Sequence, residues 1–300
     1  MCGRFGLTRP ERLDLERFGI REFPPLVPRF NIPPGSDILA VREREGGRRA
    51  DFVRWGLVPA WAKDPDIGAR MANARADTAF EKPAFRSAMK SRRCLVPADV
   101  FYEWQIVPGQ TRKQPHAIRL SGGEPFAMAG LWEYWKAKDA EGEGMVTGAL
   151  LTTEANALMA RIHDRMPVII APEHYDAWLD PRTPAPALRD LMQPCPSEWL
   201  EAYPISLRVN NPRADDAQGA GAGRAGALSA GYSATVVARR PRQAHTRRSP
   251  RTTRRRHWNS LNAAGTGALE TQLMVRRVPL RTISIVAPPP SGGTMPDGFA

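Results

Sequence analysis

The composition of this 300-residue chain excludes several classes of protein before any motif is considered. No apolar run approaches the roughly twenty residues that span a bilayer, and the first residues lack the apolar core of a secretion signal, which predicts a cytoplasmic protein. The three cysteines are widely separated without a C-x-x-C pair, which argues against a disulfide framework and a zinc site. The formal charge is +12, but residues 214–300 hold 13 arginines and 4 acidic residues, so most of the basicity belongs to the tail.

The pattern of apolar and polar residues predicts short strands separated by turns, together with a few helices. Strands are expected at 51–56, 94–104, 115–120, 126–132, 146–152 and 168–170. Helices are expected at 8–18, 155–163, 173–178 and 185–192. Strands outnumber helices and do not alternate regularly with them. This favours an α+β fold, with a mainly antiparallel, barrel-like β-sheet core and peripheral helices, over a doubly wound sheet.

The composition changes near Ala214 and divides the chain in two. Residues 1–213 are interpreted as one folded domain. Residues 214–300 contain Gly/Ala repeats, an Arg/Pro/Thr stretch and a proline run, and such a tail does not bury enough apolar surface to offset its ordering entropy. We therefore expect this tail to be disordered. Its lack of lysine fits a basic nucleic-acid tail and a shifted reading frame equally well.

Cys2 is unusual because removal of Met1 makes it an N-terminal 1,2-aminothiol. The α-amine has a pKa of about 8 and a free thiol one of about 8.5, so part of each group is deprotonated at neutral pH. Such a pair attacks a carbonyl with the amine, as a Schiff base, or with the thiol, and closes a ring with both. By itself, however, one cysteine without a base is more typical of an unimportant terminus.

Five further polar residues stand in apolar or turn-rich surroundings. Asn31 lies in a proline-containing turn, and Asn73 and Arg75 lie in a segment of small residues. Glu103 is a carboxylate among aromatic residues, an environment that raises a carboxyl pKa and suits it to general acid/base catalysis. His163 lies where an expected helix gives way to a strand. Taken one at a time, each is more typical of a structural residue.

In combination these residues resemble the SOS-response-associated peptidase (SRAP) family, the abasic-site crosslinkers. The resemblance is carried by blocks that occur in the family's order over about 1–213, essentially a whole domain. The blocks are Met1–Phe5, Arg29–Pro34, Trp55–Trp61, Asn73–Thr78, Arg93–Trp104, Phe126–Trp132, Thr152–Asn156, Ile162–Ile169 and Val209–Arg213. The family's usual ending is missing after Arg213, and nothing beyond Ala214 resembles it.

The resemblance implies a covalent reaction with damaged DNA. The mature Cys2 would react with the ring-opened aldehyde of an abasic deoxyribose in single-stranded DNA and form a thiazolidine. Asn73 would hold the α-amine or the sugar, and Glu103 would act as general acid/base. His163 would assist proton transfer at the sugar hydroxyl. The expected setting is the DNA-damage response of a nucleoid-associated monomer that needs no metal or cofactor.

The resemblance also implies residues that contact DNA. Guanidinium groups pair well with phosphate oxygens, which makes the arginines the best candidates for backbone contacts. Stacking on a base and a wedge at a strand junction are expected of an aromatic side chain and of the proline-containing turn. The expected DNA-binding residues are Arg4, Asn31, Pro34, Arg75, Trp104 and Arg165.

Two other interpretations stay open at this point. The family name records a thiol autopeptidase, in which Cys2 is the nucleophile, Asn73 the oxyanion donor, and Glu103 or His163 the base. A non-catalytic binder of single-stranded DNA is the third interpretation, but it gives Cys2 and Glu103 no purpose. Intact mass after incubation with abasic DNA, plain DNA and a generic peptide discriminates the three.

Overall fold

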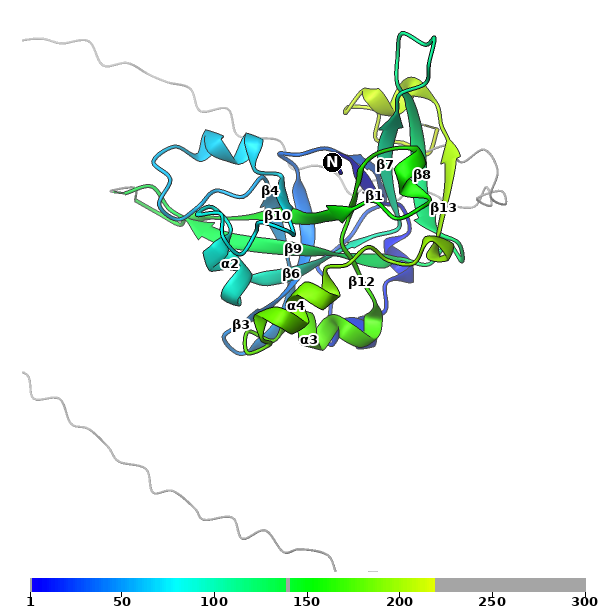
Figure 1. Ribbon diagram of the computed structural model, residues 1–300. Coiled ribbons are helices and arrows are strands. Elements are labelled where there is room, and N and C mark those ends of the chain that lie inside the picture. The colour runs from blue at the N-terminus through cyan, green and yellow to red at the C-terminus, as the bar shows by residue number, and fades with distance from the viewer. Residues whose placement is uncertain (1, 139–140, 219–300) are drawn as a thin grey trace, which may run out of the picture. The chain divides into compact units, whose positions relative to one another are not determined.

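The computed structural model describes residues 2–138 and 141–218 (Figure 1). Residues 219–300, on which most of the expected disordered tail falls, lie outside the described residues. Within the described part the chain is mostly β-structure, arranged as two sheets with few and short helices. None of the helices in that part has the length and apolar character that crossing a membrane requires.

The first sheet has five strands, and all of its pairings are antiparallel. Its order is β13 (Leu200–Pro204), β8 (Gln114–Leu120), β7 (Val100–Gln105), β1 (Phe5–Leu7) and β2 (Arg29–Ile32). β1 pairs on both sides, with Phe5 opposite Phe101 of β7 and opposite Ile32 of β2. This inner position fixes the residues that precede β1 beside the end of β7.

The second sheet has eight strands. Seven follow one path, in the order β11 (Arg165–Pro167), β10 (Met145–Glu154), β4 (Gly47–Trp55), β3 (Asp37–Arg44), β6 (Arg93–Ala98), β9 (Phe126–Trp135) and β12 (Ile169–Ile170), and β5 (Asn73–Arg75) pairs with β10. A further pairing between β10 and β9 closes β10, β4, β3, β6 and β9 into a ring. β10 pairs in parallel with β4 and β5, whereas the other pairings of this sheet are antiparallel.

Short helices and turns lie outside the two sheets (Figure 1). The described α-helices are α1 (Leu15–Phe18), α2 (Arg86–Ser91), α3 (Tyr175–Leu179) and α4 (Ala185–Leu191). The 3-10 turns are Pro10–Arg12, Pro65–Arg70, Met159–Arg161, Pro172–His174, Ser197–Trp199 and Leu207–Asn210. α1 begins after Asp14, whose carboxylate accepts from two backbone N–H groups, and it ends at Gly19 with φ of 64°. Both caps satisfy backbone groups that so short a helix leaves unpaired.

The architecture corrects the α+β expectation in two respects. The predominance of antiparallel strands with peripheral helices is confirmed, but the fold is mostly β, and two sheets, one of them a ring, take the place of a single barrel-like sheet. The helix expected at 155–163 is reduced to the turn Met159–Arg161. Ala155 N–H donates to the Asp164 carbonyl at 3.1 Å, so the segment closes a compact connection between the antiparallel strands β10 and β11.

The single strand expected at 94–104 is in fact two strands, β6 and β7, which belong to different sheets. The break is at the buried Asp99, whose carboxylate accepts from Thr8 N–H at 2.8 Å and Arg9 N–H at 2.7 Å. These bonds also explain why no regular helix begins at Thr8. The Asp99 N–H donates to the Gly6 carbonyl at 3.0 Å. The chain therefore leaves the ring at Asp99 and carries Glu103 into the five-stranded sheet beside the N-terminal segment.

The core consists mainly of two clusters of buried apolar side chains. One gathers residues of the ring together with α3 and α4, and Trp178 is fully buried in it. The other takes side chains from both sheets and includes Cys2, Phe5 and Trp55. The N-terminal cysteine is thus anchored in the junction between the two sheets.

Candidate active site

Strand pairing places Cys2 next to Glu103. The antiparallel register of β1 and β7 sets Phe5 opposite Phe101, and the Tyr102 N–H donates to the Arg4 carbonyl at 2.9 Å, which extends the pairing toward the N-terminus. Continued by one more residue, this register brings the chain just after Cys2 alongside Glu103. Two residues separated by a hundred positions in sequence therefore become neighbours.

The second sheet contributes Asn73. Its β5 strand pairs in parallel with β10, with Asn73 opposite Leu150, and the Asn73 side-chain amide donates to the Cys2 carbonyl at 2.8 Å. The preceding Ala72 carbonyl accepts from the indole N–H of Trp55 at 2.8 Å, and the Trp55 ring meets Phe5 edge-on at 5.2 Å. Cys2 is thus held from both sides, by β1 in one sheet and by Asn73 in the other.

The thiol of Cys2 is fully buried. Burial, followed by the charge of the nearby Glu103 carboxylate, raises the pKa of the Cys2 thiol far above its ordinary value. Its sulfur lies 3.9 Å from the Arg4 carbonyl, to which the thiol donates. The raised pKa favours the neutral thiol at physiological pH, so a nucleophilic role of Cys2 would need a proton acceptor nearby.

Glu103 is the nearby carboxyl whose charge acts on this thiol. Only 2 % of the residue is exposed, and this burial raises the pKa of its carboxyl, while the nearby His163 acts in the opposite direction. The environment expected from the aromatic neighbours in sequence is thus present. A carboxyl with a raised pKa exchanges protons closer to neutral pH than an exposed one does.

His163 lies beside Glu103 with its ring partly open to solvent, the side chain being 26 % exposed. Its Nδ1 lies 3.0 Å from the Arg165 N–H and 2.8 Å from a carboxylate oxygen of Asp164. Both contacts are made by the same ring nitrogen, and both partners follow His163 directly in the chain. They fix the position of the ring.

A groove of about 750 Å³ opens beside these residues. It is lined by four of the residues singled out from sequence, namely Arg75, Trp104, His163 and Arg165. Cys2 and Glu103 therefore lie beside an accessible groove lined by basic, acidic and aromatic side chains. Other residues that line this groove were not singled out from sequence, among them Gln105, Ile106, Lys113, Arg161, Glu154 and Asp164. They come from segments far apart in sequence, and none carries a local signal beyond its own chemistry.

The remaining expected DNA contacts are placed less directly. Asn31 is buried, and its amide donates to the carbonyls of Val209, Asn211 and Ala214 at 2.9–3.2 Å. Arg4 donates to the Asn31 side-chain oxygen at 2.8 Å. In this arrangement both side chains hold the segment Val209–Ala214, called here the C-terminal segment. Their contact with DNA stays a prediction.

Pro34 and Trp104 are more accessible. Pro34 is exposed in the turn between β2 and β3. Trp104 donates from its indole N–H to the Asn210 side chain at 2.7 Å, which fixes the orientation of the ring at the groove. The partner Asn210 could not be found from sequence spacing, because 106 residues separate it from Trp104.

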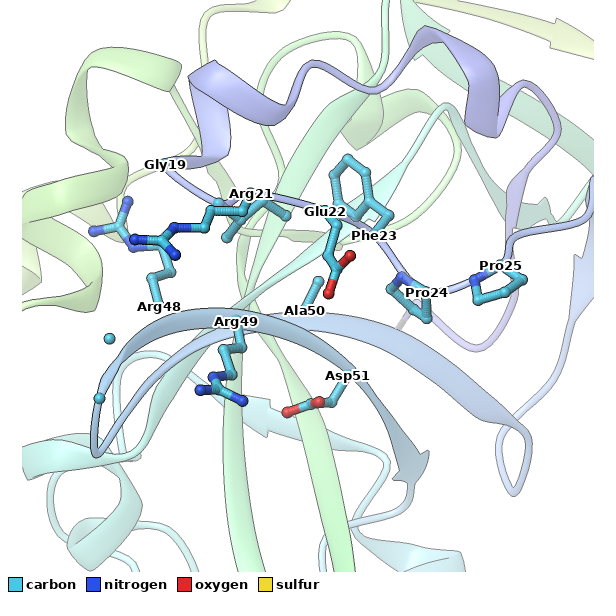
Figure 2. Close-up of a pocket in the computed structure, with 13 residues that line it drawn as sticks. Gly19, Arg21, Glu22, Phe23, Pro24, Pro25, Arg48, Arg49, Ala50 and Asp51 are labelled. Carbon is cyan, nitrogen blue, oxygen red and sulfur yellow. The ribbon is translucent and has the colours of Figure 1, made fainter.

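Two further features define what surrounds the site. Within residues 2–138 and 141–218, no group of three or more His, Cys, Asp or Glu side chains is arranged to hold a metal ion. A second cavity of about 670 Å³ lies between the segment Gly19–Pro25 and the β3–β4 hairpin (Figure 2). It contains none of the candidate site residues.

A family model described as SOS response associated peptidase (SRAP) matches residues 1–212. The abasic site processing protein YoaM of Bacillus subtilis (strain 168) is 42% identical over 222 residues, which are 73% of this chain and 96% of that protein. The abasic site processing protein YedK of Escherichia coli (strain K12) is 29% identical over 227 residues, or 73% of this chain and 98% of YedK. A solved structure from Bacteroides thetaiotaomicron superposes with a TM-score of 0.62 at 26% identity, covering 73% of this chain and 96% of that one.

Proposed function

The chain belongs to the SOS response associated peptidase (SRAP) family, and from this premise we propose that it processes abasic sites in single-stranded DNA by forming a covalent bond through Cys2. The relatives named above as abasic site processing proteins support the substrate. The single observation that carries the proposal is the burial of the Cys2 thiol beside Glu103, with the Cys2 carbonyl held by Asn73.

The reaction begins with hydrolysis of the bond between Met1 and Cys2, which frees the α-amine. That amine adds to the C1′ aldehyde of the ring-opened abasic deoxyribose, and the carbinolamine loses one water to give an imine. The Cys2 sulfur then adds to the imine carbon, and the thiol proton ends on the former imine nitrogen. The product is a thiazolidine, and one water is released for each crosslink.

Glu103 moves the protons that these steps require. It accepts a proton from the sugar hydroxyl or thiol and returns it to the leaving water or to the imine nitrogen. The raised pKa of its carboxyl, caused by burial, supports both directions of transfer near neutral pH. Asn73 keeps the backbone of Cys2 in place, so that amine and thiol face one carbon atom.

The groove supplies the DNA contacts in this proposal. Arg75 and Arg165 bind backbone phosphates, Trp104 stacks on a base, and His163 assists proton transfer at the sugar hydroxyl. Pro34 wedges a junction at the edge of the site. Arg4 and Asn31 support this surface by holding the C-terminal segment against β1 and β2.

The raised pKa of the Cys2 thiol, caused by its burial, also bears on the alternative of a general thiol peptidase. A cysteine nucleophile that attacks peptides is activated by a lowered pKa or by a base that holds the thiolate. Here the thiol is neutral, which favours attack by the amine first and ring closure by the thiol second. Peptide hydrolysis is therefore restricted in this proposal to release of Met1.

The test is intact-protein mass spectrometry of the full-length chain. Wild-type protein is incubated with single-stranded DNA containing one abasic site, with the same strand without it, and with a generic peptide. We expect a starting mass that lacks Met1, and a gain equal to the abasic strand minus one water in the first sample alone. Protein that stays unmodified by abasic DNA, or that cleaves the peptide, contradicts the proposal.

A further inference from the structure

Asp77 joins two arginines that line the groove. Its carboxylate accepts from Arg75 Nε at 3.2 Å and from Arg75 Nη2 at 2.9 Å, a fork that uses both oxygens. Nη2 of Arg165 lies 3.7 Å from one of these oxygens. The hydrogen bond from Arg75 lowers the pKa of the Asp77 carboxyl, so Asp77 is ionised throughout the physiological range. One carboxylate therefore stands between two guanidinium groups that repel each other.

The two arginines differ in how firmly they are held. Arg165 has a side chain only 8 % exposed, and its Nη2 donates to the Thr152 carbonyl at 2.6 Å. Thr152 lies opposite Arg75 in the pairing of β10 with β5. Arg75 is 58 % exposed, and its guanidinium is oriented by Asp77. The buried arginine is thus fixed by the sheet, whereas the position of the exposed one depends on Asp77.

The same short strand also holds Cys2. Asn73, which binds the Cys2 carbonyl, and Arg75 are two residues apart on β5, so both project from the same face, about 6.6–6.8 Å apart along the strand. An arginine that is correctly oriented at this position places a phosphate at a fixed distance from the nucleophile. A wrongly oriented one leaves the phosphate bound but the sugar out of place.

Fold stability does not explain the Asp77 contacts. Both partners of the Arg75–Asp77 pair are more than half exposed, and ion pairs of this kind contribute little to stability. Asp77 also places a negative charge where a DNA backbone must approach, which opposes binding. A residue that lowers affinity and adds little stability needs another reason to be in the groove.

We propose that Asp77 is a positioning residue that aligns Arg75 beside Arg165 as a two-arginine clamp for one backbone phosphate next to the abasic sugar. The inference rests on the proposed function and deepens it. Asp77 occupies two of the five N–H donors of Arg75, which leaves three for the phosphate. The negative charge of Asp77 lowers the affinity of the clamp for any single strand. The alignment of the bound phosphate, however, sets the sugar in reach of Cys2.

The first test compares Asp77→Asn with Glu154→Gln in the full-length protein. Glu154 is an exposed acid whose Cα pairs with Arg165 across β10 and β11, so the control removes the same charge from the same edge. We expect both variants to bind plain single-stranded DNA more tightly at low salt. Only Asp77→Asn should lower the crosslinking rate at saturating abasic DNA, by about ten- to a hundredfold, the effect of a misplaced reactant. Equal saturating rates for the two variants overturn the proposal.

The second test needs no crosslinking and separates this inference from the proposed function. The affinity for plain single-stranded DNA is measured for Arg75→Ala alone and in the Asp77→Asn background. If Asp77 orients Arg75, the loss of Arg75 costs several-fold less in that background, a non-additive result. Additive effects overturn the clamp. If wild-type protein forms no adduct, the proposed function fails, and this cycle still decides the role of Asp77.

Discussion

The groove beside Cys2 and the cavity shown in Figure 2 are similar in size, about 750 and 670 Å³, and both are lined by arginines. Their chemistry differs. In the cavity of Figure 2, Arg48 donates to Glu43 and Asp176 at 2.8 Å and to the Phe18 carbonyl, so its charge is already used within the protein. Glu22 also lines that cavity and is exposed.

The buried residues Cys2 and Glu103 lie beside the groove. Both are nearly inaccessible, burial raises the pKa of each, and the Glu103 carboxylate raises that of the Cys2 thiol further. The cavity of Figure 2 results instead from a hairpin turn at Gly46 and Gly47, whose φ values of 88° and 112° favour glycine, packed near an exposed loop. Size and positive charge therefore do not distinguish the groove from this cavity, whereas buried titratable groups with a raised pKa do.

The largest effect is expected from Cys2→Ala. The variant keeps an α-amine after Met1 removal and loses the thiol, so the heat-stable adduct with abasic DNA should disappear completely. An imine trapped by borohydride should persist, because the amine remains. A denaturing gel with and without borohydride measures both. The control Cys195→Ala, which removes a cysteine far along the chain, should keep the heat-stable band. A heat-stable band from Cys2→Ala would contradict the role proposed for the Cys2 thiol.

Glu103→Gln should slow crosslinking by about a hundred- to ten-thousandfold, the usual contribution of a positioned acid/base group. The carboxylate form is the base, so the wild-type rate should rise with pH through the raised pKa of Glu103, a rise that the variant lacks. Single-turnover crosslinking rates of both proteins across a pH series give the ratio of the wild-type rate to the variant rate. If this ratio of rates stayed constant from acid to neutral pH, Glu103 would have a structural role and not an acid/base role.

Whereas Glu103→Gln should lower the crosslinking rate, it should raise the stability of the protein at neutral pH. Folded Glu103 has a pKa raised by burial, so the folded state binds this proton more tightly than the unfolded state does. The wild-type protein therefore loses stability as pH rises from about 4.3 through the raised pKa, and each tenfold difference in proton affinity corresponds to about 1.4 kcal/mol. Glu103→Gln should have a higher Tm than wild type at neutral pH and no advantage at acid pH.

A moderate effect on stability is expected when the chain is shortened at the end of the domain. The Asp215 carboxylate accepts from the backbone N–H of Phe30 at 2.5 Å and of Asn31 at 2.8 Å, and the Ala214 carbonyl accepts from the Asn31 amide. A chain ending at Arg213 loses these bonds, which should lower the free energy of unfolding by roughly 2–4 kcal/mol relative to one ending at Gln218. Chemical denaturation of both chains measures the difference.

The chain that ends at Gln218 also tests whether residues 219–300 contribute to DNA affinity and to crosslinking. Residues 219–300 carry 13 arginines and 2 acidic residues, so their removal should weaken non-specific DNA affinity and flatten its salt dependence. Crosslinking should survive, because the residues assigned a chemical role lie before this point. A folded protein of this length that no longer crosslinks abasic DNA would show that the tail belongs to the active unit.

The smallest effect is expected from Arg49→Ala in the cavity of Figure 2. Arg49 is exposed, and its removal should change the crosslinking rate by less than about twofold and the free energy of unfolding by less than about 0.5 kcal/mol. Arg75→Ala, which makes the same change in the groove, should clearly weaken binding. Equal losses of DNA affinity in the two variants would mean that the cavity also binds DNA.

The sequence by itself determined the chemistry that is available. The position of Cys2 after Met1 predicts an aminothiol once Met1 is removed, and the aromatic neighbours of Glu103 predicted a buried carboxyl, which the structure confirms. The change of composition near Ala214 predicts a domain boundary there, and among the described residues contacts continue as far as Asp216, which binds Arg208. These are local properties, readable from the residue and its neighbours.

Only the tertiary structure decided which of these groups meet. The break at Asp99, the bond from Asn73 to the Cys2 carbonyl and the Asp77 contact with Arg165 depend on pairing between strands that are distant in sequence. Periodicity predicts that a strand exists but not its partner, because strand pairing is selected by packing of the whole core. The sequence thus supplies the candidate groups, and the junction of the two sheets brings them together.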